Sequence, residues 1–307
     1  MKLEKSINYM GWPNCIRLSN SEVEVVIASD IGLRILRFGF IGEQNILYLA
    51  DEDKGHCGGD FWRIYGGHRL WHAPEAMPRS YSPDNDPISF EFMKQTLKIT
   101  QTRETATGIV KEMEIRLSAD CNHLMVLHRL INQNLWDIKF SPWAISALAA
   151  GGRAIIPQEP YGEGDHYLLP VRSLALWSYT QMNDPRWTWG NKYIQARQDL
   201  SVNSEQKIGL MNKQGWAAYC LGEDLLIKLF EYDQAAEYPD FGSNQEIYIN
   251  RMFLEMETLG SFRSVPSQGK AEHVENWWLS KARVESSEES IARELLPRVS
   301  SIRAHLK

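Results

Sequence analysis

Alternation of apolar and polar residues runs through most of this chain. Residues 23–32 and 33–40 predict two strands around an Asp-Ile-Gly turn. Residues 89–104 and 109–120 predict a hairpin that turns at Thr107 and Gly108. The same period-2 pattern returns at residues 123–133, 225–232, 246–259 and 273–284. The chain therefore predicts many strands joined in sequence by turns.

A helical pattern stands out only near the end of the chain. Ser286 and Glu289 have the spacing of a capping box, and Pro297 is expected to kink or shorten the helix that follows. We expect this helix at about residues 287–305, packed on the outer face of the sheets. Its apolar positions recur at helical intervals: Ile291, Leu295, Val299 and Ile302.

The order of the elements indicates the fold class. Consecutive strands with hardly any crossover helices favour an all-β, antiparallel sandwich over βαβ units. Neither a low-complexity linker nor an internal repeat divides the chain, so we expect one domain over residues 1–307, with the sandwich ending near residue 285.

Composition excludes several function classes. The 307 residues include 33 basic and 39 acidic ones, a net charge of −6, without a basic stripe for nucleic acid or a polybasic cluster for lipid. No apolar run approaches the ~20 residues that span a bilayer, and the N-terminus has no signal-peptide core. Four separated cysteines fit free thiols, so we expect a cytoplasmic protein.

Two glutamates in the predicted strand 246–259 are candidates for acid–base chemistry. Glu255 and Glu257 are two residues apart, so both carboxylates face the same side of a strand, about 6.6 Å apart along it. On a concave, partly desolvated face each charge would disfavour the other, which lifts one pKa toward the range of a general base. The alternative is a solvated strand face that carries ordinary glutamates.

The segment Gly66–Glu75, "GGHRLWHAPE", concentrates polar and aromatic side chains. His68 and His72 have the spacing of two metal ligands on a helix, but the preceding glycines and Pro74 make a helix unfavourable there. We expect a metal-free loop that brings His68, Arg69 and His72 to a binding pocket. A metal site and a purely structural loop are the alternatives.

Several segments, in this order, carry a resemblance to a known family. The chain is similar to the galactose mutarotase-like (aldose 1-epimerase) superfamily, in particular to its bacterial DUF4380-type branch. The segments are "SDIGLRILRFGFIGEQNILYL" (29–49), "GGHRLWHAPE" (66–75), "LHRLINQN" (127–134), "FSPWAISALAAGGRAIIPQ" (140–158), "SLALWSYTQMNDPRWTWGNKYI" (173–194), "AEYPDFGSNQEIYINRMFLEMETLG" (236–260) and "AEHVENWWL" (271–279).

The resemblance implies an antiparallel β-supersandwich whose concave face binds a sugar. In mutarotases a glutamate in a Leu-Glu step takes the proton of the anomeric hydroxyl, and a histidine protonates the ring oxygen. Leu254-Glu255 matches that step, so Glu255 is implied as the base, with His68 or His72 as the acid. The family's Asn-His segment is replaced here by Ser141-Pro142-Trp143-Ala144, where Trp143 offers an indole for sugar stacking.

Four further polar residues are candidates for other roles. Arg186 and Asp240 lie in turn-rich segments from which they could reach sugar hydroxyls, with surface or turn-stabilising roles as the alternatives. Glu257 is expected to bind substrate or to raise the pKa of its neighbour. Lys228, in an apolar strand, is expected to point outward rather than to pair with a buried anion.

These observations together predict an aldose 1-epimerase-like enzyme that interconverts sugar anomers. The reaction needs only proton transfer at an acetal carbon, so we expect no metal and no organic cofactor, and a small sugar or sugar derivative as the ligand. The absence of the Asn-His segment favours a second hypothesis, a sugar-binding protein without turnover. A carbohydrate lyase or hydrolase on the same fold is a third.

Overall fold

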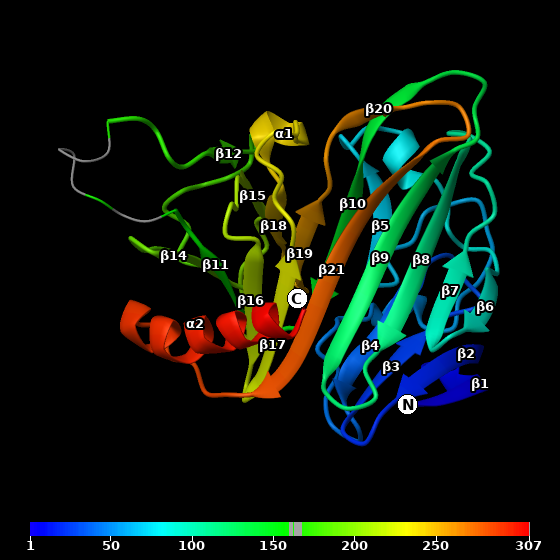
Figure 1. Cartoon of the computed structure of the whole chain (residues 1–307), viewed down its shortest axis with the longest axis horizontal. Coiled ribbons are helices and arrows are strands. Elements are labelled where there is room, and N and C mark those ends of the chain that lie inside the picture. Colours follow the sequence, from blue (N-terminus) through cyan, green and yellow to red (C-terminus); the bar gives the residue numbers. More distant parts are fainter. Residues whose placement is uncertain (160–161, 163–167, 307) are drawn as a thin grey trace.

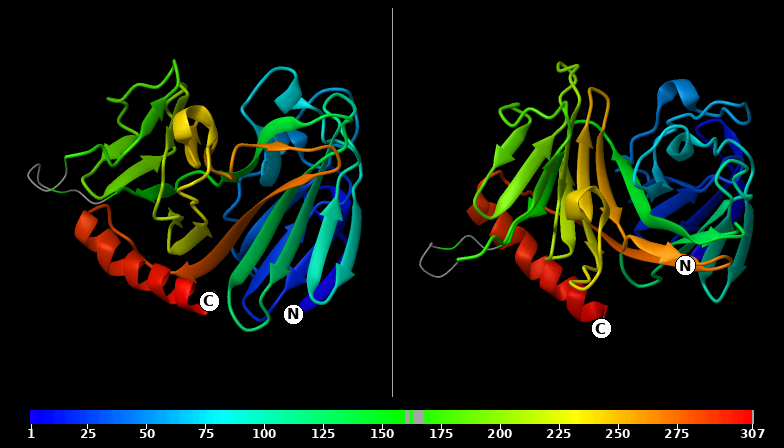
Figure 2. Two further views of the ribbon diagram at one scale, coloured as in Figure 1. Left: turned by 45° about the horizontal axis from the view of Figure 1, so that its top comes forward. Right: turned by 90° about the horizontal axis from the view of Figure 1, so that it is seen from above.

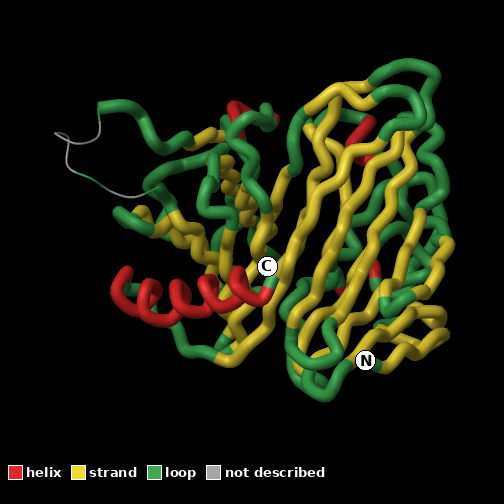
Figure 3. Tube along the Cα trace, in the orientation of Figure 1, coloured by secondary structure: helices red, strands yellow, loops and turns green. Residues whose placement is uncertain are grey.

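A computed structural model of the chain describes residues 1–159, 162 and 168–306, and it consists mainly of β-strands (Figures 1 and 3). Within these residues the strands form an 11-stranded and a 10-stranded sheet, in which every strand pair that we describe is antiparallel. The chain thus has the all-β, antiparallel architecture that its alternating pattern predicts.

The first sheet has the strand order β1-β2-β3-β4-β5-β10-β19-β18-β15-β12, and β20 pairs with β10 beside this path. Its strands are β1 (Lys2–Tyr9), β2 (Trp12–Ser19), β3 (Val23–Ile27), β4 (Arg34–Phe40), β5 (His68–Ala73), β10 (Ile138–Leu148), β12 (Leu174–Leu176), β15 (Gln206–Leu210), β18 (Gln245–Ile249), β19 (Leu254–Leu259) and β20 (Arg263–Val265).

The second sheet has the order β13-β14-β11-β16-β17-β21-β9-β8-β7-β6. Its strands are β6 (Ser89–Met93), β7 (Thr96–Thr100), β8 (Ile109–Leu117), β9 (His123–Asn132), β11 (Arg153–Pro157), β13 (Trp187–Trp189), β14 (Tyr193–Arg197), β16 (Trp216–Leu221), β17 (Asp224–Phe230) and β21 (Lys270–Lys281). The short helical turns are η1 (Asp51–Asp53), η2 (Arg79–Tyr81) and α1 (Pro239–Gly242).

The two sheets pack face to face around one continuous apolar core. Phe38 on β4 and Trp277 on β21 meet across the two layers, with their ring centres 5.9 Å apart. β9 shows the predicted alternation, since every second residue is buried and the others are half-exposed. β19, in contrast, is buried on both faces, because further segments cover the outer face of the first sheet.

The C-terminal helix α2 (Glu288–His305) lies against the outer face of the second sheet, as predicted (Figures 1 and 2). Its predicted apolar stripe is buried against strand residues that include Trp216 and Ile227. The cap lies one residue later than predicted, because Ser287 accepts a hydrogen bond from the Ser290 amide. The helix also continues through Pro297 instead of ending there.

Two of the predicted strands are in fact hairpins. Residues 89–104 contain β6 and β7, because the chain reverses at Lys94 and Gln95, which both have a positive φ. Residues 246–259 contain β18 and β19, which pair with each other. Within the described residues, no helix is both long and apolar enough to cross a membrane.

Candidate functional site

A cavity of about 550 Å³ lies on the outer face of the first sheet, a size that suits a small-molecule ligand. We call it the main cavity. Side chains from β5, β10, β15, β18 and β19 form its floor, and residues from the connecting segments line it further. The lining residues are Trp62, Ile64, Arg69, Trp71, Glu75, Tyr81, Trp143, Ile145, Trp177, Tyr179, Glu205, Lys207, Tyr248, Asn250, Phe253, Glu255 and Glu257.

The segment "GGHRLWHAPE", predicted to be a loop, is instead mostly the strand β5. β5 pairs with β4 on one side and β10 on the other. Gly66 and Gly67 turn the chain into this strand with φ of 87° and 72°. A Cβ atom at Gly67 would collide with the Ile35 carbonyl oxygen, so the close approach of the backbones requires glycine.

Because β5 is a strand, its side chains alternate between two environments. Arg69 and Trp71 line the main cavity. His68 contacts His128 of the second sheet and is therefore in the interior between the sheets. The structure thus brings Arg69 to Glu255 but places the His68 imidazole on the opposite face from both.

Glu255 and Arg69 form an ion pair at the floor of the main cavity. The Nη1 of Arg69 donates to Glu255 Oε1 at 2.7 Å, and both side chains are almost entirely buried. The guanidinium also stacks against aromatic faces, since its central carbon lies 4.6 Å from the ring centre of Trp71 and 5.8 Å from that of Trp62. These contacts fix the Glu255 carboxylate where it lines the cavity.

Glu257 belongs to a second charged group, which is fully buried. Its Oε2 accepts hydrogen bonds from Trp143 Nε1 at 2.7 Å and from Lys207 Nζ at 3.2 Å. The same Nζ lies 2.8 Å from Glu246 Oε2, so that one ammonium group serves two carboxyl groups. Burial raises the pKa of both glutamates, although the Lys207 charge acts against it.

Two indoles hold the Lys207 ammonium in place. Nζ lies 4.6 Å from the ring centre of Trp143 and 4.8 Å from that of Trp177. This arrangement separates the main cavity from a neighbouring one of about 330 Å³, which we call the second cavity. Asp240 and Glu246 line the second cavity. Trp143, predicted as a stacking residue, therefore forms part of the wall between the two.

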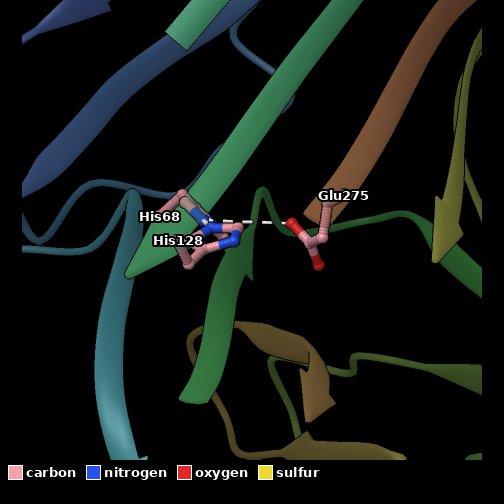
Figure 4. Close-up of side chains that lie close together, drawn as sticks. All are labelled: His68, His128 and Glu275. Atoms are coloured by element: carbon pink, nitrogen blue, oxygen red, sulfur yellow. Dashed lines mark hydrogen bonds and ion pairs between the residues drawn. The ribbon is translucent and has the colours of Figure 1, made fainter. Parts of the chain in front are cut away.

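His68 belongs to a hydrogen-bond network that is closed off between the sheets (Figure 4). The Nδ1 of His128 lies 3.0 Å from the His273 carbonyl oxygen, which can only accept, so this nitrogen carries the proton. Burial lowers the pKa of His128 to about 4, so the ring is neutral and its Nε2 accepts. The His68 Nε2, 2.7 Å away, must therefore donate.

The proton order of the rest of this network follows from that assignment. With its proton on Nε2, His68 accepts at Nδ1 from the Ser146 hydroxyl, 2.7 Å away. The Ser146 oxygen in turn accepts from Lys228 Nζ at 2.6 Å. Lys228 was predicted to point outward, which is wrong: it is fully buried and pairs with Glu275 at 3.0 Å.

The group His68, His128 and Glu275 has the spacing of a metal site, and Figure 4 shows the three side chains converging. Their hydrogen bonds argue for a structural role. Both imidazole Nε2 atoms are bonded to each other, and both Glu275 oxygens accept from the Lys228 ammonium. Burial alone would raise the pKa of Glu275, but the charge of the Lys228 ammonium group lowers it. Lys228 thus supplies the positive charge that a metal ion would otherwise supply.

The other predicted site residues lie at different places. His72 is buried, and its Nε2 lies 3.4 Å from Glu104, which is not among the residues lining the main cavity. Arg186 is buried in an ion pair with Asp184 at 2.8 Å and lines neither cavity. Arg186 and Asp240 were both predicted to lie in turns near the ligand, and only Asp240 lines a cavity, the second cavity.

Lys207 and Glu246 were missed by the sequence reasoning. Glu246 was hidden because residues 246–259 were interpreted as one strand. A turn near Arg251 would have placed Glu246 directly opposite Glu257, as the register shows. Lys207 lies in a short strand next to β18, and a single lysine there has no sequence signal that separates it from a surface charge.

Comparison with known proteins supports the fold and leaves the finer relationship open. No family model and no curated protein matches this chain. Among solved structures, a galactose mutarotase-like protein from Lactobacillus casei superposes with a TM-score of 0.57 at 10% identity, over 87% of this chain and all of the other. A galactose mutarotase-like protein from Clostridium acetobutylicum gives 0.55 at 11% identity, over 92% and 99%.

A TPR-domain containing protein from Parabacteroides distasonis has the same kind of similarity. It superposes with a TM-score of 0.59 at 14% identity, over 89% of this chain and 48% of its own, so this chain spans about half the length of that protein. These structures show that the chain has the galactose mutarotase-like fold. At such identities they carry no residue assignment.

Proposed function

We propose that the main cavity binds a sugar. The observation that carries this proposal is the combination of aromatic walls with buried carboxylates. Trp62, Trp71 and Trp143 offer flat apolar faces for the C–H faces of a sugar ring. Glu255 and Glu257 offer acceptors for its hydroxyl groups. The fold shared with galactose mutarotase-like proteins agrees with this ligand class.

The charges of the cavity favour an uncharged sugar. Arg69 and Lys207 are its only cations among the described lining residues, and each is already paired with a carboxylate. Glu75 and Glu205 line the same cavity and add further negative charge. A phosphate or carboxylate on the ligand would therefore meet like charges without a free cation, at a cost in binding free energy.

We further propose that the bound sugar interconverts between its anomers, with Glu255 as the general base. Glu255 takes the proton of the anomeric hydroxyl, the bond between C1 and the ring oxygen breaks as C1 becomes a carbonyl carbon, and the ring oxygen gains a proton. Rotation about C1–C2 and the reverse steps close the other anomer. No atom is gained or lost, so the step needs only a base and an acid.

Substituting Glu255 tests this proposal directly. Glu255→Gln keeps the side-chain shape but removes the basic oxygen, so kcat for interconversion should fall by about 10²–10⁴-fold while the sugar still binds. Polarimetry of freshly dissolved α-aldoses and calorimetric binding measure the two quantities. Glu91→Gln, on an exposed position of β6, is the matched control. Full activity in Glu255→Gln would contradict the assignment of the base.

A sugar-binding protein without turnover is the second candidate. One observation favours it: His68 and His72, the two imidazoles expected to supply the acid, do not line the main cavity. Wild-type protein that binds sugars by calorimetry but leaves the rate of anomer interconversion unchanged would establish this candidate. Product analysis on the same sugar panel would reveal a lyase or hydrolase.

A further inference from the structure

We propose that Glu246 and Glu257 form a carboxylic acid pair that shares one proton across Lys207, and that Glu257 donates this proton to the ring oxygen of the bound sugar. The inference rests on the anomer interconversion proposed above and supplies the acid that this reaction needs. It concerns two residues on neighbouring strands of the cavity floor, β18 and β19.

The register of the hairpin brings these two side chains together. Glu246 and Glu257 stand directly opposite each other in the β18–β19 ladder, where facing Cβ atoms are about 4.5–5.5 Å apart. Both are completely buried, and neither can turn its charge to solvent. Lys207 Nζ lies within 3.2 Å of both carboxyl groups.

The charges of Glu246, Glu257 and Lys207 indicate that one of the two carboxyl groups keeps a proton. Two ionised carboxylates and one ammonium would leave a net negative charge in a fully buried site, and two like charges at this distance disfavour each other. Retaining one proton on the pair makes the group neutral. The pair therefore titrates as a unit, as two carboxyl groups that share a proton do.

Unsatisfied oxygen atoms in the group point to the same state. Both carboxyl oxygens of Glu246 and Oε1 of Glu257 are buried and have no hydrogen-bond partner within the described part of the chain, although Lys207 Nζ lies 2.8 Å from Glu246 Oε2. Buried polar atoms are normally bonded, so these oxygens call for a proton or a ligand. Trp143 and Lys207 hold the other oxygen of Glu257, which leaves Oε1 as the atom able to carry and donate the proton.

Glu257 lies where an acid could act together with Glu255 as the base. Both lie on one face of β19, about 6.6 Å apart along the strand, and both line the main cavity. The anomeric hydroxyl oxygen and the ring oxygen of an aldose are attached to the same carbon. A sugar placed between the two glutamates can therefore offer its hydroxyl to Glu255 and its ring oxygen to Glu257.

Lys207 and the buried imidazoles are less suitable donors. Burial would lower the pKa of Lys207, but the neighbouring carboxylates raise it, so its ammonium group releases a proton reluctantly. The imidazoles of His68 and His128 bond to each other between the sheets. Once Glu257 has given its proton, the Lys207 charge stabilises the carboxylate, and the reverse step returns the proton from the sugar hydroxyl to Glu257.

Infrared spectroscopy tests the shared proton without any sugar. At pH 7 the wild type should show the carbonyl stretch of one buried protonated carboxyl group, which both Glu246→Gln and Glu257→Gln should lose. Glu91→Gln, with its exposed position, should keep it. Absence of the signal in the wild type, or its survival in both pair variants, would overturn the inference.

The pH profile of anomer interconversion tests the donation step. Glu257→Gln should lower kcat by about 10²–10⁴-fold and largely keep sugar affinity. In Glu246→Gln the two carboxyl groups no longer titrate as a pair and the shared proton is lost, so the pH optimum of kcat/KM should move by about one unit or more. A purely structural role would lower activity without moving the optimum.

The two proposals can fail separately. A wild type that binds sugar but never accelerates interconversion overturns the proposed reaction, while the infrared signal still decides whether the proton is shared. An active wild type whose Glu257→Gln variant keeps full kcat overturns the role of Glu257 and leaves the reaction intact. If the Glu246→Gln variant is active and its pH optimum does not move, the shared proton has no part in the reaction. This outcome overturns the role of the Glu246–Glu257 pair and leaves the reaction intact.

Discussion

The buried imidazoles between the sheets should make the folded state sensitive to mild acid. Burial lowers the pKa of His128 to about 4 and that of His273 to about 3, in a setting that also holds Lys228. An unfolded histidine titrates near 6.5. Their stabilising contribution is therefore fully present above pH 6.5 and is lost as the pH falls from there toward their folded values, because only the unfolded chain takes up the protons.

The magnitude follows from these pKa values. Between pH 8 and pH 5, an imidazole that stays neutral in the fold but titrates near 6.5 when unfolded loses about 2 kcal/mol of stability. His128 and His273 together therefore account for about 4 kcal/mol, which is a large part of the 5–15 kcal/mol typical of folded domains. Glu246 and Glu257 act in the opposite direction, since their raised pKa favours the folded state as the pH falls.

A substitution at His273 isolates the histidine contribution. The ring's Nε2 is 2.7 Å from the Thr258 hydroxyl, which donates to Glu275, so the ring donates. The amide of a glutamine can replace this donor without titrating. The change in unfolding free energy between pH 8 and pH 5, measured by urea unfolding with tryptophan fluorescence, should be about 2 kcal/mol smaller in His273→Gln than in the wild type.

Exposed His56 provides the matched control, since His56→Gln should leave the pH dependence of stability as in the wild type. The comparison between proteins cancels the contributions of Glu246 and Glu257, because both are present in each. Equal changes for the wild type and His273→Gln, within about 0.5 kcal/mol, would refute the neutral, buried state of His273.

Three further substitutions test other parts of the structure. Lys228→Met should cost about 3–5 kcal/mol of unfolding free energy, because it leaves the buried Glu275 charge without its counter-charge, and adding Glu275→Gln should recover much of the loss. Leu295→Ala, at the fully buried centre of α2, should cost about 2–5 kcal/mol by the same urea assay. Trp143→Phe removes the hydrogen bond to Glu257 and should weaken sugar binding in calorimetry by about 1–3 kcal/mol; unchanged affinity would contradict a place for Trp143 in the sugar site.

The fold could be predicted from the sequence because its signal is local. Period-2 alternation in segments such as residues 123–133 reports one buried face, and that is what β9 shows. The hairpins within residues 89–104 and 246–259 were missed because alternation continues through their turns, and other strands were missed where alternation is lost. β5 and most of β10 are buried on both faces. The residues of β10, Ile138–Leu148, are almost all apolar or small, so they form one continuous stretch without alternation. Such strands have no alternating pattern to find.

The residues that line the main cavity could be predicted only in part, for a related reason. Glu255 and Glu257 were found because their two-residue spacing within one strand is a local feature. Arg69 was expected near the pocket but for the wrong structural reason, as part of a loop. Which side of the sheet each residue faces depends on strand register, and a shift of one residue exchanges the two faces. His68 and Arg69, neighbours in sequence, consequently lie in separate polar systems.

These two systems share the strands that separate them. His68, Ser146 and Thr258 of the buried network each stand next in sequence to a residue that lines the main cavity: Arg69, Ile145 and Glu257. The network joins these three strands to the second sheet, since its bonds reach His128 on β9 and Glu275 on β21. Catalytic groups need supports that fix their backbone and rotamers. The imidazoles that resemble a metal site thus help to fix the strands that form the floor of the main cavity.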